Sequence, residues 1–406
     1  MLKILFIGLV WPEPTSSAAG WRILQLVKLL LQEYEVHFAS AASKSPYSYD
    51  LNALGVIEHD IKLNDSSFDR FITSLDPYAV IFDRFMVEEQ YGWRVVENAP
   101  NALRILDTED LHFLRLARQE AFKKNLPVNI YHETTKREIA SILRSDLSLI
   151  ISNHEMNLLA EQFKVDAERL FYLPFQEDRL EYPIHRKEVG ERAHFVFIGN
   201  FIHEPNWRTV ELLKRHIWPK LRKSLPQAEL HIYGAYATEK VNQLHNPKER
   251  FFIKGRAEDA RETLEQYRVL LAPIPFGAGA KGKFVDAMYA GTPSVTTSIG
   301  AENMMLDDSW GGIIADEDSI FINAAIELYL NDEKWNTLQQ LGFSIYNSTI
   351  ANTAHSAVLL NWLRKSKEQI ETLRRQNFIG QILQQQQVNA TKYMSLWIEQ
   401  KNNKGN

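Results

Sequence analysis

The chain has 406 residues, which is more than one hydrophobic core usually supports, so we expect two domains. A net charge of −5 argues against nucleic acid as a partner, and the lack of cysteine excludes disulfides and thiolate metal sites. The first residues read as a strand rather than a signal peptide, and no apolar run reaches the roughly 18–20 residues of a membrane span. We expect a cytoplasmic protein, able to rest on the inner face of a membrane, and leave its oligomeric state open.

Strands and helices alternate through the first half of the chain. The apolar patterns predict strands at 3–9, 35–39, 80–83, 104–106 and 147–152, and helices at 21–32, 88–97, 111–143 and 153–163. Such alternation is typical of a parallel sheet covered by helices. The segments 174–178 and 185–192 read as a linker, so we expect a first doubly wound, Rossmann-like domain over 1–183.

A second alternation follows the linker. It predicts strands at 195–198, 229–233, 251–253, 269–272, 294–296 and 312–315, and hence a second doubly wound α/β domain over 193–365. Ligands of such sheets bind outside the carboxyl ends of the strands, so the two domains should face each other across a central cleft. The polar helical pattern at 366–399, broken near Gly380, predicts that residues 366–406 form helices that pack back on the first domain, with a frayed end.

The most informative segment is a loop of small residues at 277–280, between an apolar strand and a helix. Lys281 and Lys283 follow the loop, and Asp286 lies one turn into the helix. Glycines let a backbone approach a phosphate, a helix start offers free N–H groups, and lysines add positive charge. The pattern therefore predicts an anion site, although it is neither a P-loop nor a dinucleotide fingerprint. A tight turn with solvated lysines is the alternative.

A second polar segment follows the predicted strand at 104–106. Its acids and His112 suit a reaction centre in which the imidazole binds a substrate hydroxyl, but Asp107 or Thr108 could instead cap the next helix. In the second half, Gly199 permits a close backbone approach and Asn206 could cap a helix. The Asp-Glu-Asp run at 316–318 formally matches a metal-binding DxD, but a helix start is the better interpretation, and we expect no metal.

The run from 277 to 296, GAGAKGKFVDAMYAGTPSVT, gives this chain a resemblance to a known family. Together with the strand and loop at 195–206 and the segment at 105–112, it resembles the GT-B glycosyltransferases, specifically the retaining family 4 (glycosyl transferases group 1). The resemblance implies two Rossmann-like domains, with C-terminal helices crossing back to the first. It also implies transfer of a sugar from a UDP- or GDP-sugar to an acceptor hydroxyl, for glycan or glycolipid biosynthesis, without a tightly bound cofactor.

By this resemblance, His112, Lys283 and Asp286 would take part in catalysis. Lys283 would neutralise the diphosphate, Asp286 would hold the ribose, and His112 would lie near the donor sugar. The first domain would take a glycan or lipid-linked acceptor. The residues implied in the donor site are Gly20, Gly199, Asn200, Gly234, Gly255, Gly277, Ala278, Gly279, Lys281, Lys283 and Asp286.

Two departures from the family pattern concern charge. The first acid of its E-x7-E motif falls on Ala278, and Asn200 and Phe201 stand where a basic residue is common, which puts weight on Lys281 and Lys283. A nucleotide-sugar epimerase of the same architecture and a non-catalytic nucleotide-binding scaffold remain as alternatives. The basic residues Arg115, Arg118, Lys123 and Lys124 are interpreted as a solvated helix face rather than a site for acidic glycans or lipids.

Overall fold

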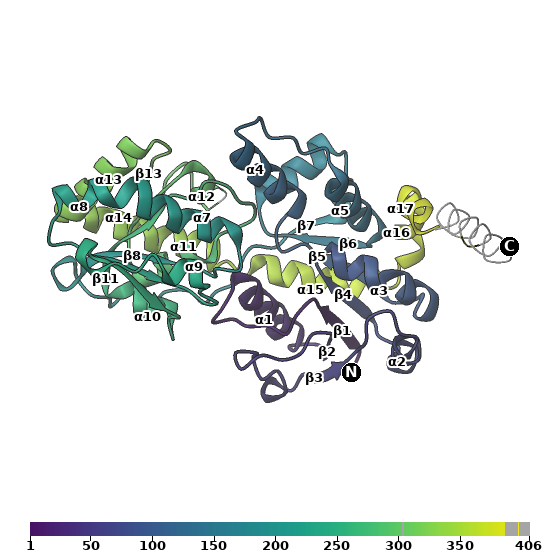
Figure 1. The fold of residues 1–406 in the computed structure, drawn as a ribbon. Helices are drawn as coiled ribbons and strands as arrows, with labels where there is room; N and C mark the ends of the chain where they lie inside the picture. Colours follow the sequence, from purple (N-terminus) through teal and green to yellow (C-terminus); the bar gives the residue numbers. More distant parts are fainter. Residues whose placement is uncertain (303, 386–396, 398–406) are drawn as a thin grey trace.

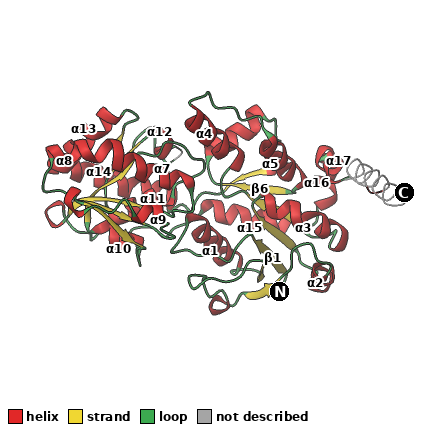
Figure 2. Ribbon diagram, in the orientation of Figure 1, coloured by secondary structure: helices red, strands yellow, loops and turns green. Residues whose placement is uncertain are grey.

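The computed structural model describes residues 1–302, 304–385 and 397 (Figure 1). It contains a seven-stranded sheet in the order β3-β2-β1-β4-β5-β6-β7 and a six-stranded sheet in the order β10-β9-β8-β11-β12-β13. Neighbouring strands within both sheets run parallel. Helices cover the sheets (Figure 2), so the expected α/β class with two Rossmann-like doubly wound units is confirmed. We call the seven-stranded sheet and its helices the first unit, and the six-stranded sheet and its helices the second unit.

The first unit contains all five predicted strands and two further ones. Because β3 lies at an edge and is largely exposed, and β7 has only three residues, neither gives a strong apolar pattern. The predicted helix at 111–143 is two helices, since α4 ends at Asn125 in a left-handed conformation shortly before Pro127. The strands are β1 Lys3–Gly8, β2 Glu35–Ser40, β3 Ile57–Asp60, β4 Ala79–Asp83, β5 Leu103–Asp107, β6 Leu147–Ile150 and β7 Leu170–Tyr172; the helices are α1 Ala18–Leu30, α2 Ser67–Leu75, α3 Phe85–Asn98, α4 His112–Lys124, α5 Glu133–Arg144 and α6 Asn153–Asn157.

The second unit contains the six predicted strands. They are β8 Ala193–Ile198, β9 Leu230–Tyr233, β10 Phe251–Gly255, β11 Tyr267–Ala272, β12 Ser294–Thr296 and β13 Gly312–Ile314. Its helices are α7 Glu204–Leu212, α8 Trp218–Ser224, α9 Glu239–Asn242, α10 Ala260–Glu265, α11 Gly282–Ala290, α12 Ser298–Ala301, α13 Asp318–Leu330 and α14 Asp332–Ile345.

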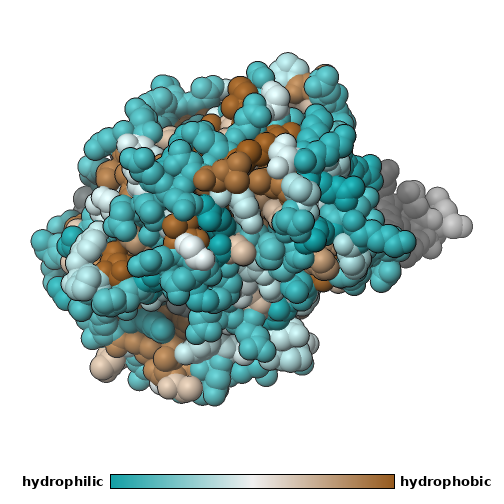
Figure 3. Space-filling model, turned by 90° about the vertical axis from the view of Figure 1, so that its left-hand side faces the viewer, coloured by the Kyte–Doolittle hydropathy of each residue, from teal (hydrophilic) through white to brown (hydrophobic). Residues whose placement is uncertain are grey.

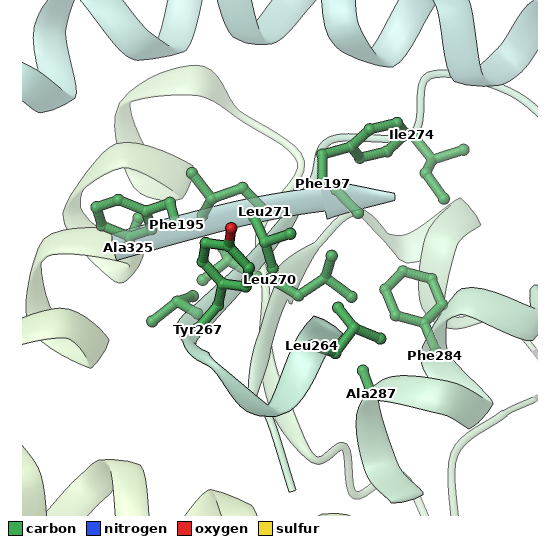
Figure 4. Packing of buried hydrophobic residues seen from close by; sticks show 14 of the residues in the cluster. Phe195, Phe197, Leu264, Tyr267, Leu270, Leu271, Ile274, Phe284, Ala287 and Ala325 are labelled. Carbon is green, nitrogen blue, oxygen red and sulfur yellow. The ribbon is translucent and has the colours of Figure 1, made fainter. Parts of the chain in front are cut away.

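The core of the second unit fixes the loop before α11. Phe197 of β8, Leu270 and Leu271 of β11, and Phe284 and Ala287 of α11 are buried in one hydrophobic cluster (Figure 4). The central strands β8 and β11 carry continuous apolar runs at 195–198 and 269–272, as expected where helices cover both faces of a parallel sheet. Both ends of the loop at 273–281 are therefore anchored in the core.

The chain returns to the first unit through α15 (Ala354–Ser366), which lies with the elements of the first sheet in Figure 1. Leu359, Leu360 and Leu363 of α15 are buried in the same cluster as Ile4 and Phe6 of β1. We therefore propose that the second unit ends near residue 351, earlier than the boundary at 365 expected from the sequence.

Two further helices follow α15. They are α16 (Ile370–Gln376) and α17 (Phe378–Gln384), and Arg374 pairs with Asp146 at 2.8 Å, so this part packs on the first unit. The predicted helical stretch is interrupted at Asn377 rather than at Gly380, and its continuation over 386–396 and 398–399 lies outside the described residues.

Within the described parts of the chain, no helix is both long and apolar enough to cross a bilayer. Figure 3 shows the face of the molecule that lies at the left of Figure 1, on the side of the second unit. This face is mainly hydrophilic, with separate small hydrophobic areas.

Candidate functional site

A cleft of about 660 Å³ lies where the carboxyl ends of strands from both sheets meet. The first unit contributes the β1–α1 loop and the residues that follow β4 and β5. The second unit contributes the β8–α7 loop, the residues after β10, and the loop between β11 and α11. Lining residues include Ser16, Arg84, Glu109, Asp110, His112, Arg115, Gly199, Asn200, His203, Asn206, Gly234, Arg256, Arg261, Gly277, Ala278, Ala280, Lys281, Lys283 and Asp286.

The two lysines after the small-residue loop both face this cleft. The Lys281 ammonium is buried and has no hydrogen-bond partner among the described residues, whereas the Lys283 ammonium donates to Asn206 Oδ1 at 2.6 Å. Burial lowers the pKa of Lys281 to about 8, and burial together with the charge of Lys281 lowers the pKa of Lys283 to about 7. Helix α11 starts at this point without a side-chain cap, so its first N–H groups add to an anion-binding surface.

The residues of the loop at 277–280 differ in what they contact. Gly277 and Ala278 line the cleft, but Gly279 does not, because its N–H donates to Glu155 Oε1 of the first unit at 2.8 Å. Gly279 has a φ of 63°, and a Cβ there would lie 2.8 Å from Asp110 Cβ, so only glycine fits. The Gly279 amide that the sequence assigned to a diphosphate therefore binds a carboxylate of the protein.

Asp286 faces the cleft in an ion pair. Its Oδ1 accepts from Arg261 Nε at 2.9 Å, and Arg261 also lies 3.1 Å from Glu177 of the inter-unit segment. Burial raises the pKa of Asp286. Sequence reasoning did not find Arg261, because a single arginine in a short polar helix gives no signal before the fold places it opposite Asp286.

His112 begins α4 at the opposite wall of the cleft. Its backbone N–H donates to Glu138 at 3.1 Å, while the preceding N–H of Leu111 donates to Glu155 at 3.0 Å. Its Nε2 lies 3.3 Å from Asp110 Oδ1, and burial lowers the pKa of His112 to about 4 against the effect of this carboxylate. The imidazole is therefore neutral near pH 7 and acts as a hydrogen-bonding group rather than a cation.

The residues expected to cap α4 and α7 make other contacts. Asp107 does not cap α4; it forms hydrogen bonds of 2.7–3.1 Å with Arg22. Asn206 bridges Lys283 and the Asn200 carbonyl instead of capping α7. The acidic run at 316–318 does mark a helix start, since Glu317 is the N-cap residue of α13 and Asp318 lies in its first turn, while Asp316 accepts a hydrogen bond of 2.8 Å from Ser298 N. In the described ranges, no group of three or more acids and histidines is arranged to hold a metal.

The remaining predicted donor-site residues fall into two groups. Gly199, Asn200 and Gly234 line the cleft, and Gly234 packs so closely that a Cβ would lie 2.2 Å from the Gly199 carbonyl oxygen. Gly20 and Gly255 lie outside its lining. Gly20 instead packs against the backbone of the β1–α1 loop, where a Cβ would lie 2.5 Å from Glu13 N.

The basic face of α4 is only partly solvated. Arg118 donates to the Gly277 carbonyl at 2.8 Å and pairs with Glu302 at 2.8 Å, while Lys123 pairs with Glu204 at 3.1 Å. These contacts join α4 to the second unit. Sequence patterns could not show this, because both partners lie far along the chain.

The depressed lysine pKa values lead to a prediction about proton uptake. An anion between Lys281 and Lys283 favours their charged forms, so binding of a diphosphate ester at about pH 8 should take up protons, whereas binding at about pH 6 should take up few. Calorimetry in buffers of different ionisation enthalpy measures this uptake. Lys283→Ala should reduce it, and equal uptake by the two proteins would contradict the assigned pKa shift.

Two Rossmann-like units around one cleft define the GT-B fold of glycosyltransferases. Residues 192–332, about a third of the chain, match the family model described as glycosyl transferases group 1. This segment contains the cleft loop of the second unit, so the resemblance inferred from 277–296 is confirmed there. A search of the curated proteins finds no significant match.

Solved structures with this fold cover nearly the whole chain. Sucrose-phosphate synthase (tll1590) from Thermosynechococcus elongatus has a TM-score of 0.66 at 16% identity, over 90% of this chain and 99% of that chain. HepE (Alr3699) from Anabaena, solved with UDP and glucose, has a TM-score of 0.67 at 12% identity, over 90% and 100%. The pneumococcal O-GlcNAc transferase GtfA, solved with UDP and GlcNAc, has a TM-score of 0.61 at 12% identity, over 92% and 99%. At these identities the likeness shows the fold alone.

Proposed function

We propose that this chain is a retaining glycosyltransferase that moves a sugar from a nucleoside-diphosphate sugar to an acceptor hydroxyl in glycan or glycolipid biosynthesis. The observation that carries this proposal is the pair of cleft lysines beside the uncapped start of α11. Lys281 Nζ is buried with no hydrogen-bond partner in the described parts of the chain, and both lysines have lowered pKa values. Desolvated cations at a helix start suit a diphosphate that gains negative charge as it leaves.

In the proposed reaction, the bond between the sugar anomeric carbon and the diphosphate oxygen breaks. Lys281, Lys283 and the α11 N–H groups stabilise the departing diphosphate, and Asp286 with Arg261 holds the ribose. The acceptor oxygen bonds to the anomeric carbon on the face that the diphosphate leaves, and its proton passes to a diphosphate oxygen. The neutral His112 hydrogen-bonds the donor sugar from the first unit.

The solved structures support a choice of donor and of acceptor. The structures of HepE and GtfA were solved with UDP, which favours a UDP-sugar for this chain. A mutant of TarM from S. aureus was solved with fondaparinux, α-GlcNAc-glycerol and UDP, which favours a glycan-like acceptor. We place the protein in the cytoplasm, with the first unit able to approach a lipid-linked acceptor at the membrane surface.

Metal independence is part of this proposal, because lysines and a helix start occupy the position where a metal would neutralise the diphosphate. Chelation with EDTA should leave turnover unchanged, and added Mg²⁺ should raise it by less than about twofold. Nucleotide release measured with and without EDTA checks this. A loss of activity on chelation, restored by one divalent ion, would contradict it.

The test of the function measures nucleotide release from UDP-glucose, UDP-GlcNAc and GDP-mannose, with and without glycan acceptors. We expect one donor to be used and acceptor-dependent release, with NMR of the product showing the anomeric configuration of the donor. Conversion of the sugar without any acceptor would instead indicate an epimerase. Nucleotide binding without turnover of any donor would indicate a scaffold.

A further inference from the structure

Two side chains in the first-unit wall of the cleft have no role in the proposed reaction. Arg84 directly follows β4 and Glu109 follows β5, and these strands are neighbours in which Asp83 lies opposite Asp107. The Arg84 N–H donates to the Asp107 carbonyl at 2.8 Å, so the two segments leave the sheet side by side. Both Arg84 and Glu109 line the cleft.

The backbone at both positions adopts conformations that favour glycine. Arg84 has φ 71° and ψ 159°, and Glu109 has φ 64°. For residues with a Cβ these conformations are unfavourable, and they occur mainly where surrounding structure and function maintain them. Arginine and glutamate, rather than glycine, occupy these positions, so their side chains are the features to explain.

The neighbouring carboxylates are already paired. Asp107 is bound by Arg22, and Asp110 Oδ2 accepts from Arg115 Nε at 2.7 Å. Asp83 accepts from a backbone N–H at 2.9 Å through one oxygen. Asp107 and Asp110 are therefore engaged by other arginines, and only the second oxygen of Asp83 pairs with Arg84, at 3.2 Å from its Nε.

Arg84 and Glu109 themselves retain unused hydrogen-bonding capacity. In the part of the chain that the structure describes, the Arg84 guanidinium has one ion-pair partner, Asp83 Oδ1, which lies 3.2 Å from its Nε. Among the described residues, its terminal nitrogens and both Glu109 oxygens make no hydrogen bond, and Glu109 Oε1 is buried. Burial raises the pKa of Glu109. A buried polar group without a partner is costly, so a ligand that supplies one is favoured.

The chemistry of this ligand follows from the mixed charge of the wall. A guanidinium fork donates hydrogen bonds, and a carboxyl group accepts them, which matches two neighbouring hydroxyls. An anionic group at Arg84 would also meet the carboxyls of Glu109 and Asp83. Arg84 lies close enough to His112 for its charge to help lower the pKa of that imidazole, so the ligand would sit beside the reacting sugar.

We propose that Arg84 and Glu109 recognise a pair of neighbouring hydroxyls on an uncharged sugar acceptor. This inference rests on the proposed function and deepens it, since it selects a neutral glycan terminus over an acidic one. It assigns to the first unit two specificity-determining residues.

The test separates acceptor use from donor use in Arg84→Gln, Glu109→Gln and Arg84→Gly. Neutral methyl glycosides and methyl glucuronide serve as acceptors. Donor use is reported separately by the slow hydrolysis of the donor without acceptor, measured as nucleotide release. We expect KM for neutral glycosides to rise about 10- to 100-fold, as for loss of a hydrogen bond to a charged group, with acceptor-free release within about twofold of wild type. The melting temperature of each variant is measured as well, because loss of the Arg84 guanidinium leaves the buried Asp83 carboxyl without its ion-pair partner, whereas Glu109→Gln leaves that pair intact.

Arg137→Gln is the matched control, since Arg137 forms an exposed pair with Glu89 outside the cleft, and it should behave as wild type. An unchanged KM in the variants, or equal use of methyl glucuronide, would overturn the inference. So would a wild type that neither glycosylates neutral glycosides nor binds them in saturation-transfer NMR. Failure of the proposed function is distinct: wild type would then release nucleotide from no donor, while the NMR still tests the subsite.

Discussion

Lys283→Ala should lower kcat/KM for glycosyl transfer by about 10²- to 10³-fold, as for loss of one preorganised group that stabilises developing charge. The Lys283 ammonium reaches the cleft over the ring of Phe197, 4.9 Å from its centre, and is held there by Asn206. Its low pKa reflects a site poor in water, where a charge acts strongly on a leaving diphosphate. Steady-state kinetics with whichever donor the nucleotide-release assay selects measure the effect.

Two controls separate charge from packing. Lys283→Met keeps the apolar stem over Phe197 but removes the charge, so it should lose as much activity as the alanine variant. Lys220→Ala removes an exposed lysine from α8 of the same unit and should have no effect. Near-normal turnover in the methionine variant would show that Lys283 fills space and does not act on the diphosphate.

Arg22→Met should lower the free energy of unfolding by about 3–5 kcal/mol, because it leaves the Asp107 carboxylate buried without its partner. Both side chains are almost fully buried, at 2% and 0% exposed, and Arg22 also donates to the Leu173 carbonyl at 2.7 Å. This pair fixes the end of β5, from which the segment with Glu109 and His112 departs. Urea unfolding followed by fluorescence measures the loss.

The double variant Arg22→Met/Asp107→Leu should recover much of this stability, because both charges are then removed. Lys136→Met breaks an exposed pair with Glu133 and should change stability by less than about 0.5 kcal/mol. If Arg22→Met were no more destabilising than Lys136→Met, the buried pair would not be what holds the β5 segment.

The fold was predictable because its signals are local. The strand expected at 195–198 lies within β8, where the side chains of Phe195, Val196 and Phe197 are buried on both faces of the sheet. Such a strand shows in the sequence as a continuous apolar run. Strands β3 and β7 were not predicted, because few of their side chains are buried. The break between α4 and α5 was missed although Pro127 signals it. The return of the chain at α15 depends on packing against β1, which no local pattern contains.

The site was predictable where one segment carries it. The loop at 277–280 with Lys281, Lys283 and Asp286 could be read along the chain, and His112 followed from its place after β5. Partners from distant segments were not predictable. Arg261 meets Asp286 only when α10 and α11 pack together, and Glu155 accepts from the Gly279 amide only after the two units come together. Ala278 is buried against the first unit, where the family pattern has an acid.

The most direct test of the central claim is binding of UDP, GDP and ADP to wild type and to Lys283→Ala by calorimetry without added metal. The cleft described here predicts that one nucleoside diphosphate binds the wild type and that Lys283→Ala weakens this binding at least about tenfold. Absence of binding by all three nucleotides, or equal affinity in the two proteins, would contradict a donor site between Lys281, Lys283 and the start of α11.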